Sequence, residues 1–445
     1  MAARASPGRA RVRGPRQREA PVINHAPGKR LKIYVFGTNE NGELGLGPIT
    51  GPQDVRRPRM NPILSSPSAG VVQVAVGGMH CVALTHDNRL LTWGVNDMGA
   101  LGRDTRYDAQ DYHDVLVNPR EATPDEVDMT LVPRDTVFTQ VTASDNATFA
   151  LTNKGYVYGW GTMRSNEGVA GFLPDVMIQP RPMLVPSVRQ VTKILAGNNH
   201  VVALTIKGTV YTWGCGEQGQ LGRRILTRLK AQCLVPFELR LRDIANIGVG
   251  ANHSFAISHT GDVYGWGSNN FGQTGIASNN TGKDFGRVSL CTLATNISDI
   301  ASIRNVGPIV DITGGNKHSL ALTANGACFV WGQLDACATG ISLRDLPRTG
   351  VIFDNRGHPR ILTTPTMIPG LLARFVAAGG DHNVAITPDY RVFSWGFNDN
   401  HQTGNQREGD IETPTLINSS LIRNRPIVWA GLGGNFSLLG EVVEP

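Results

Sequence analysis

Long apolar runs are missing from this sequence, and so is a strongly charged or acidic composition. No stretch approaches the roughly 18 apolar residues of a membrane-spanning helix, and the Arg-rich N-terminus lacks the apolar core of a signal peptide. Charged residues make up 18% of the chain, below the usual ~25%. These absences predict a protein that makes no membrane contact, and they exclude a coiled coil and an acidic disordered chain.

Cysteine chemistry is also sparse. The six cysteines form no C-x-x-C pair and no zinc-finger spacing, and they lie at Cys81, Cys215, Cys233, Cys291, Cys328 and Cys337. We interpret them as free thiols of an intracellular protein rather than as a disulfide framework. No metal site and no cofactor are expected, and no phosphate-binding G-x-x-x-x-G-K-[ST] motif is present.

Glycine is abundant instead, with 52 residues, and one glycine-rich phrase recurs along the chain. It consists of a short apolar strand, Gly-Gly-x-x-His, Ala-Leu-Thr, a turn, a strand ending in Trp-Gly, and Asn-x-x-Gly-x-x-Gly. Copies occupy residues 76–102, 196–222, 249–275, 314–340 and 378–404, with a weaker copy at 143–168. A fixed unit with inserts of variable length is typical of a repeat fold.

Polar and apolar residues alternate within each copy, as in 208–213, so each unit is predicted to be a small antiparallel sheet. Residues 33–47 match only the second half of the phrase, and residues 427–439 match only the first half. Six full copies and two halves predict an all-β, seven-bladed propeller over residues 33–445, whose last blade is built from both termini. Such closure removes the open sheet edges that invite aggregation.

Positive charge is concentrated at the N-terminus. Residues 1–32 have a net charge of +8, whereas the other 413 residues sum to −2. This segment is rich in Pro and Gly and has no periodicity, so we expect a flexible arm that does not fold alone. A polycation of this kind favours DNA or another polyanion, although a solvated tail without a partner is the alternative.

Several recurring residues have a structural and a functional interpretation. Five histidines share one slot of the repeat (His80, His200, His253, His318 and His382), as do six tryptophans (Trp93, Trp160, Trp213, Trp266, Trp331 and Trp395). We interpret the histidines as a hydrogen bond repeated in each blade rather than as metal ligands. The tryptophans are predicted to pack between blades rather than to stack on bases. Residues 214–219 spell G-x-G-x-x-G but align with the turns of other repeats, so we predict a turn and no dinucleotide site.

The repeated phrase resembles the regulator of chromosome condensation family, which are guanine nucleotide exchange factors of the GTPase Ran. The resemblance covers nearly the whole chain after residue 32, and its most specific stretches are 77–105, 159–172 and 211–223. The middle stretch is similar to the family's β-wedge, which presses on the GTPase, and places the wedge at 162–171. The wedge residues implied by the resemblance are Thr162, Met163, Arg164, Ser165, Asn166, Glu167, Gly168 and Val169.

The same resemblance implies catalytic positions on one face of the ring at Glu40, Asp145, His318 and Asn199. Three departures from the family pattern accompany them. Asn199 is an amide where the family has a carboxylate, and two histidine slots hold Ala147 and Phe436.

Two basic segments are expected to bind the nucleosome. Arg9, Arg11, Arg13 and Arg16 of the arm would meet DNA. Residues 223–230 occupy the place of the loop with which the family grips the acidic patch of the histones. Arg224 and Arg228 are the candidates there, since the guanidinium fork pairs well with clustered carboxylates.

No nucleophile–base pair stands out, so covalent chemistry is not expected. The resemblance implies a monomeric, nuclear, chromatin-associated exchange factor. It would promote release of GDP and loading of GTP on Ran, in support of nucleocytoplasmic transport and mitosis. The alternative is a non-catalytic propeller adaptor that binds chromatin or another protein, which the departures at Asn199 and Phe436 favour.

Overall fold

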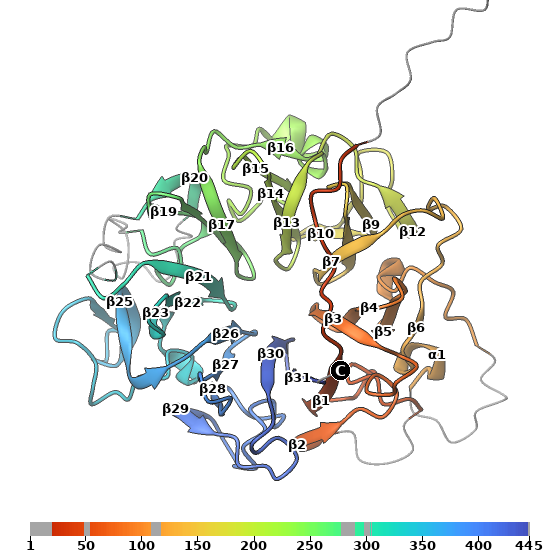
Figure 1. Cartoon of the computed structure of the whole chain (residues 1–445). Coiled ribbons are helices and arrows are strands. Elements are labelled where there is room, and N and C mark those ends of the chain that lie inside the picture. The colour runs from red at the N-terminus through yellow and green to blue at the C-terminus, as the bar shows by residue number, and fades with distance from the viewer. Residues whose placement is uncertain are drawn as a thin grey trace, which may run out of the picture.

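The computed structural model describes residues 20–443 apart from 49–53, 108–116, 277–289, 298–302 and 304. Seven antiparallel sheets stand in a ring around a central axis (Figure 1). The all-β, seven-bladed prediction is therefore confirmed. Within the described part of the chain the helical segments are short: α1 (Pro119–Ala122), η1 (Asp97–Gly99), η3 (Thr227–Leu234) and η5 (Asp335–Cys337). None of them is long and apolar enough to cross a membrane.

Six blades follow one another along the chain, each with its first strand nearest the axis. The first blade contains β3 (Val71–Val76), β4 (His80–Thr85), β5 (Leu90–Gly94) and β6 (Asp125–Glu126). The second contains β7 (Phe138–Ala143), β8 (Ala147–Thr152), β9 (Val157–Gly161) and β12 (Gln179–Leu184). The third contains β13 (Val191–Ala196), β14 (His200–Thr205), β15 (Val210–Gly214) and β16 (Phe237–Glu238). The fourth blade contains β17 (Ile244–Val249), β18 (His253–Ser258), β19 (Val263–Ser268) and β20 (Leu290–Asn296). The fifth contains, in spatial order, β21 (Ile309–Gly314), β22 (His318–Thr323), β23 (Ala327–Gln333), β25 (Pro359–Leu372) and β24 (Val351–Phe353). The sixth contains β26 (Phe375–Ala378), β27 (His382–Ile386), β28 (Val392–Gly396) and β29 (Ile411–Leu416). The fifth strand, β24, is an addition that the repeat does not predict.

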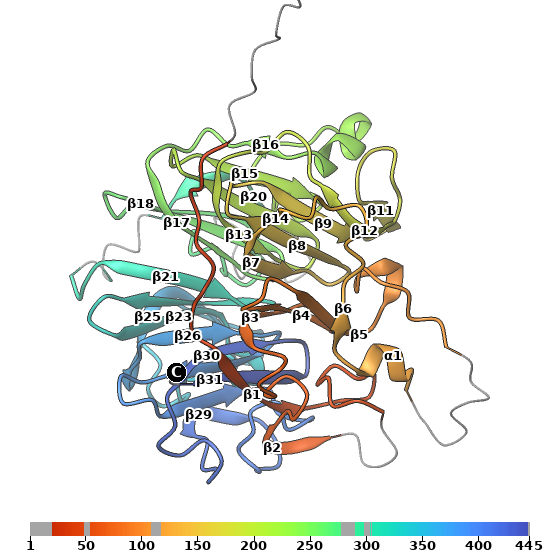
Figure 2. The same cartoon turned by 45° about the vertical axis from the view of Figure 1, so that its right-hand side comes forward.

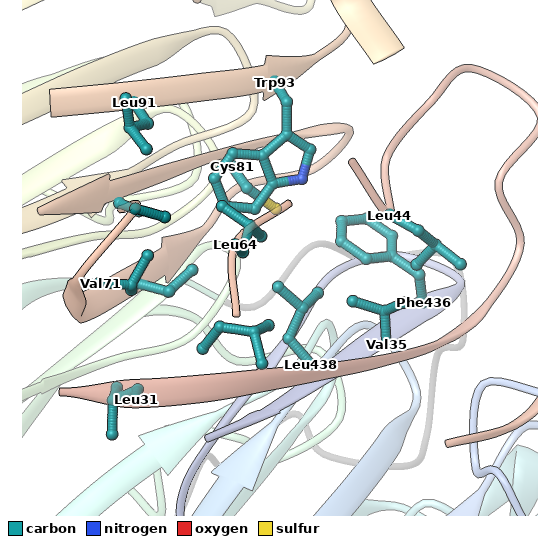
Figure 3. Packing of buried hydrophobic residues seen from close by; sticks show 14 residues of the cluster. Leu31, Val35, Leu44, Leu64, Val71, Cys81, Leu91, Trp93, Phe436 and Leu438 are labelled. Carbon is teal, nitrogen blue, oxygen red and sulfur yellow. The ribbon is translucent and has the colours of Figure 1, made fainter. Parts of the chain in front are cut away.

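The closing blade combines both ends of the chain, as predicted. Its strand order is β2 (Val55–Met60), β1 (Leu31–Gly37), β31 (Phe436–Val442) and β30 (Ile427–Leu432). β1 and β31 pair over seven residues, from Leu31 with Val442 to Gly37 with Phe436. The Tyr34 hydroxyl donates to buried Glu441 over 2.5 Å. Figure 3 shows Phe436 and Leu438 of this blade packed beside Trp93 and Cys81 of the β3–β6 blade.

The repeated histidines and tryptophans join neighbouring blades, which confirms the structural interpretation of both. His253 Nε2 donates to Ser319 Oγ of the next blade over 2.7 Å, and Ser319 donates to the Gln273 carbonyl over 2.8 Å. The Trp331 indole donates to the same carbonyl over 2.9 Å. Burial lowers the pKa of His253 to about 3, so its ring is neutral at physiological pH.

Inner strands of a propeller leave one backbone edge unpaired, and polar side chains at the third position of these strands cover that edge. Gln140 of β7 donates to the Ile194 carbonyl over 2.7 Å and accepts from the Ile194 amide over 3.1 Å. Lys193 of β13 donates to Asn246 of β17 over 2.7 Å, and Asn246 donates to the Val310 carbonyl over 2.8 Å. This belt between blades was not predicted from the repeat.

The ring has two distinct faces because the strands of each blade alternate in direction. One face, here called the wedge face, carries the turns between first and second strands and between third and fourth strands. Residues 20–30 run across the other face (Figure 2). There Ile23 N donates to the Asn153 carbonyl over 2.8 Å, and Asn24 Nδ2 donates to the Val191 carbonyl over 2.8 Å. The end of the arm is thus held on the face opposite the wedge.

Candidate functional site: the wedge face

The mouth of the axial channel forms a cavity of about 320 Å³ at the centre of the wedge face. Glycines and short polar residues line it, including Asp145, Asp381 and Asn435. A chain of backbone hydrogen bonds connects these turns from blade to blade. Its bonds run from Asp145 N to Asn198 O (2.9 Å), Asn198 N to Ala251 O (2.9 Å), Ala251 N to Gly315 O (3.0 Å), Asn316 N to Gly380 O (2.7 Å) and Gly380 N to Gly433 O (3.3 Å).

Glycine is required in these turns because the backbone passes close to the histidine of its own blade. A Cβ at Gly197 would lie 2.2 Å from the His200 imidazole, and a Cβ at Gly250 would lie 2.2 Å from that of His253. The turns therefore form a rigid rim with few side chains. A partner docking here meets mainly backbone and a small number of polar groups.

Asp145 is a half-buried carboxylate of this rim. It follows β7, and burial raises its pKa to about 6, while the nearby Arg164 of the wedge opposes that shift. The carboxylate is therefore ionised at physiological pH but incompletely solvated. It is placed to meet a cationic group of a docked partner.

Replacing Asp145 with asparagine is expected to stabilise the propeller at neutral pH. The folded pKa lies above the unfolded value of about 3.8, so stability falls as pH rises through about 4 to 6, and the full cost of the buried charge applies above that range. We expect Asp145→Asn to raise the free energy of unfolding by about 2 kcal/mol near neutral pH and to change it little near about pH 4. Urea unfolding at the two pH values measures this difference. An equal effect at both would contradict the assignment.

The predicted wedge is a hairpin that leaves the β7–β12 blade after Trp160. Its strands are β10 (Met163–Ser165) and β11 (Gly168–Gly171), which pair only with each other. Met163 at its base is 1% exposed and packs in the core with Phe172 and Trp213. The base of the hairpin thus belongs to the fold, whereas its tip projects from the wedge face.

Asn199 holds the wedge at its first strand. Its Oδ1 accepts a hydrogen bond from Arg164 N over 2.7 Å. An amide oxygen accepts this bond as a carboxylate would, so Asn199 holds the hairpin without carrying a charge. Glu40 lies apart from the hairpin, exposed in the turn after β1. That turn is joined to the channel rim by a bond from Thr38 N to the Asn435 carbonyl over 3.0 Å.

His318 is buried, whereas a residue that contacts a docked partner must be exposed. Its side chain is completely buried, and Nε2 lies 2.7 Å from Asn383 Oδ1 of the next blade. Asn383 Nδ2 donates to the Ala338 carbonyl over 2.8 Å. The imidazole has no path to a docked protein, so any part of His318 in exchange is to position Asn383 and the rim.

The two departing histidine slots are filled by other means. Phe436 is 1% exposed, and its ring occupies the imidazole position beneath Gly433. At the other slot, the backbone of Ala147 is held by Ser144, whose Oγ accepts a hydrogen bond from Ala147 N over 3.0 Å. Neither substitution opens the rim. The sequence departures at these slots therefore change packing rather than the shape of the channel mouth.

The basic segment 223–230 runs from the turn after β15 into the start of η3 and lies beside the wedge. Arg223 is stacked over the Phe237 ring at 4.6 Å, whereas Arg224 and Arg228 are exposed. Lys230 lies 3.1 Å from Glu167 of the wedge. Arg9, Arg11, Arg13 and Arg16 lie outside the described residues. Among the described residues, no three His, Cys, Asp or Glu side chains form a group that could hold a metal.

The sequence matches the RCC1-like domain over residues 32–439. This chain is a member of the RCC1-like domain family. It is 40% identical to protein pim1 of Schizosaccharomyces pombe over 425 residues, which is 94% of this chain and 76% of pim1. It is 35% identical to the guanine nucleotide exchange factor SRM1 of Saccharomyces cerevisiae, covering 93% of this chain and 87% of SRM1.

Among solved structures, this RCC1-like chain is similar to Prp20p from Saccharomyces cerevisiae. The TM-score is 0.85 at 34% identity, covering 95% of this chain and 94% of Prp20p. That structure is described together with the binding of Prp20p to Gsp1p and histones. The predicted resemblance to the family is confirmed.

Proposed function

We propose that this protein is a guanine nucleotide exchange factor for a small GTPase of the Ran class. The observation that carries the proposal is the β10–β11 hairpin, which projects from the wedge face beside Asp145 and the channel rim. The family membership and the names of the relatives, SRM1 and Prp20p among them, support it. The protein acts without covalent chemistry: it binds the GTPase and favours the state that lacks nucleotide.

Binding energy drives the exchange. By linkage, a partner that weakens nucleotide binding is itself bound less tightly when nucleotide is present. An acceleration of about 10⁵-fold lowers the dissociation barrier by about 7 kcal/mol. Surface ion pairs contribute about 0–1 kcal/mol each, so Glu40 and Asp145 alone are insufficient. The rim, the wedge and the surrounding turns supply a large interface that reshapes the loops of the GTPase, and abundant GTP then refills the empty site.

Release of a fluorescent GDP analogue from purified Ran tests the proposal. The protein is added at sub-stoichiometric amounts with excess GTP. Fast release over many turnovers supports the exchange function. Release at the spontaneous rate, from a protein shown to be folded, would indicate the alternative function, a non-catalytic adaptor. The uncharged Asn199 is the observation that favours an adaptor.

The two basic segments serve attachment to chromatin in the nucleus. Arg228 on η3 and Arg224 just before it are exposed, and arginine suits clustered histone carboxylates. Residues 20–30 are held on the face opposite the wedge, and the charge of the arm favours DNA. In this proposal the protein is a monomer that binds the GTPase through the wedge face and the nucleosome through its two basic segments.

Charge reversal of Arg224 and Arg228 is expected to weaken nucleosome binding by about tenfold. Release of nucleotide from free GTPase is expected to stay unchanged, because the proposal assigns both side chains to the nucleosome. Gel-shift titration on nucleosomes measures the first effect and fluorescence the second. Arg240→Glu, an exposed arginine after β16 of the same blade, is the matched control. An equal loss in the control, or undiminished binding in the double variant, would contradict the assignment.

A further inference from the structure

The wedge hairpin cannot fix its own orientation. β10 and β11 comprise three and four residues, and their register shifts between Met163 and Arg164. An isolated two-stranded ribbon is marginally stable at best in water. At the tip, a Cβ on Gly168 would find nothing within 4 Å. Contacts from outside the hairpin therefore determine where the tip points.

Those contacts come from the neighbouring β13–β16 blade. Glu217, in the turn after β15, accepts a hydrogen bond through Oε2 from Asn166 N at the tip over 2.8 Å. Lys230 of η3 lies 3.1 Å from Glu167 Oε1 and 3.6 Å from Glu217 Oε1. Together with the bond from Arg164 N to Asn199, these contacts attach both the start and the tip of the hairpin to one blade.

The contacts differ in strength. The Lys230 and Glu167 side chains are 47% and 76% exposed, so their ion pair is screened and contributes little. Glu217 is only 20% exposed and bonds a backbone amide. A bond from a backbone amide to an ionised carboxylate is about twice as strong as a neutral one. Glu217 is therefore the principal restraint on the tip.

We propose that Glu217 is a positioning residue for nucleotide exchange: it fixes the wedge tip in the orientation that engages the GTPase. This inference rests on the proposed function of the wedge. The equivalent turn positions hold Glu40, Asp97, Asn270, Asp335 and Asp399, so a polar side chain here is a feature of the repeat. What distinguishes Glu217 is its hydrogen bond to the wedge tip. It lies within 214–219, which the sequence predicts only as a turn, and its partner Asn166 is 51 residues away.

Glu217→Ala tests the proposal, with Asp399→Ala as the matched control because Asp399 occupies the same turn position in another blade and is exposed. Hydrogen–deuterium exchange of residues 163–171 reports the restraint directly. In Glu217→Ala we expect the Asn166 amide to exchange at least about tenfold faster. We expect the Asp399 variant to match the wild type.

Exchange kinetics on Ran give the second readout. We expect the maximal rate of GDP release to fall about tenfold in Glu217→Ala, with the half-saturating GTPase concentration unchanged. Glu217→Gln keeps an acceptor oxygen and is expected to restore most of the rate. Unchanged hydrogen exchange in Glu217→Ala would overturn the proposal. So would a raised half-saturating concentration at an unchanged maximal rate, which would indicate direct contact with the GTPase. Wild-type protein without exchange activity would refute the proposed function. Hydrogen exchange would still test whether Glu217 restrains the wedge tip.

Discussion

Joining Met163 directly to Gly171 through a two-residue Asn-Gly turn is expected to reduce GDP release to near the spontaneous rate, a loss of at least about 10³-fold. These two residues are paired across the hairpin base, and Asn-Gly forms the tight turn that such a connection needs. The change removes the projecting tip but retains buried Met163 and Phe172. On the proposed function, the GTPase would then bind the rim without the element expected to displace its nucleotide-binding loops. Stopped-flow fluorescence with labelled GDP measures the rate.

The fold should survive this change, because the deleted residues contribute little to the core. The thermal midpoint is expected to stay within a few degrees of the wild-type value. Deletion of Met163 as well is the informative comparison, since it removes a side chain that packs with Trp213 and should destabilise the blade. Full exchange activity in the shortened but folded protein would refute the wedge as the active element.

Removing residues 427–445 is expected to abolish cooperative folding. The deletion takes away β30 and β31, so β1 loses a seven-residue partner and the inner ring is broken between β26 and β3. It also removes Phe436 and Leu438 from the core shared with Trp93 (Figure 3). Loss of two buried side chains alone costs several kcal/mol, a large fraction of the 5–15 kcal/mol by which domains of this kind are stable. Circular dichroism and size-exclusion chromatography measure the outcome.

A circular permutant supplies the control. Val443 N donates to the Arg30 carbonyl over 2.9 Å, so the two ends of the ring are adjacent and a short linker can join them. New termini are placed between Asn355 and Arg356, which are exposed at the turn between β24 and β25. The permutant keeps the closing blade and is expected to fold. A truncated chain that melts cooperatively near the wild-type temperature would show that closure is dispensable.

Much of the architecture was predictable because each repeat carries the residue pattern that specifies its strands and turns. The alternation in 208–213 specifies strands, and the half-phrases at 33–47 and 427–439 specify the closing blade. The slots of His253 and Trp331 recur, so a structural role in every blade follows from the pattern alone. The hairpin at Met163–Gly171 appears where the resemblance places the wedge.

The sequence by itself thus determined the blade, the number of blades and how the ring closes, because these depend on local patterns that repeat. Only the tertiary structure decided what happens between blades. It buries His318 behind the rim, raises the pKa of Asp145, and brings Glu217 to the wedge tip. The hydrogen bonds of His318 with Asn383 and of Glu217 with Asn166 join residues from different blades, 65 and 51 positions apart in the sequence. The physical reason is that burial and hydrogen bonding depend on which blades become neighbours, and that proximity exists only once the ring has formed.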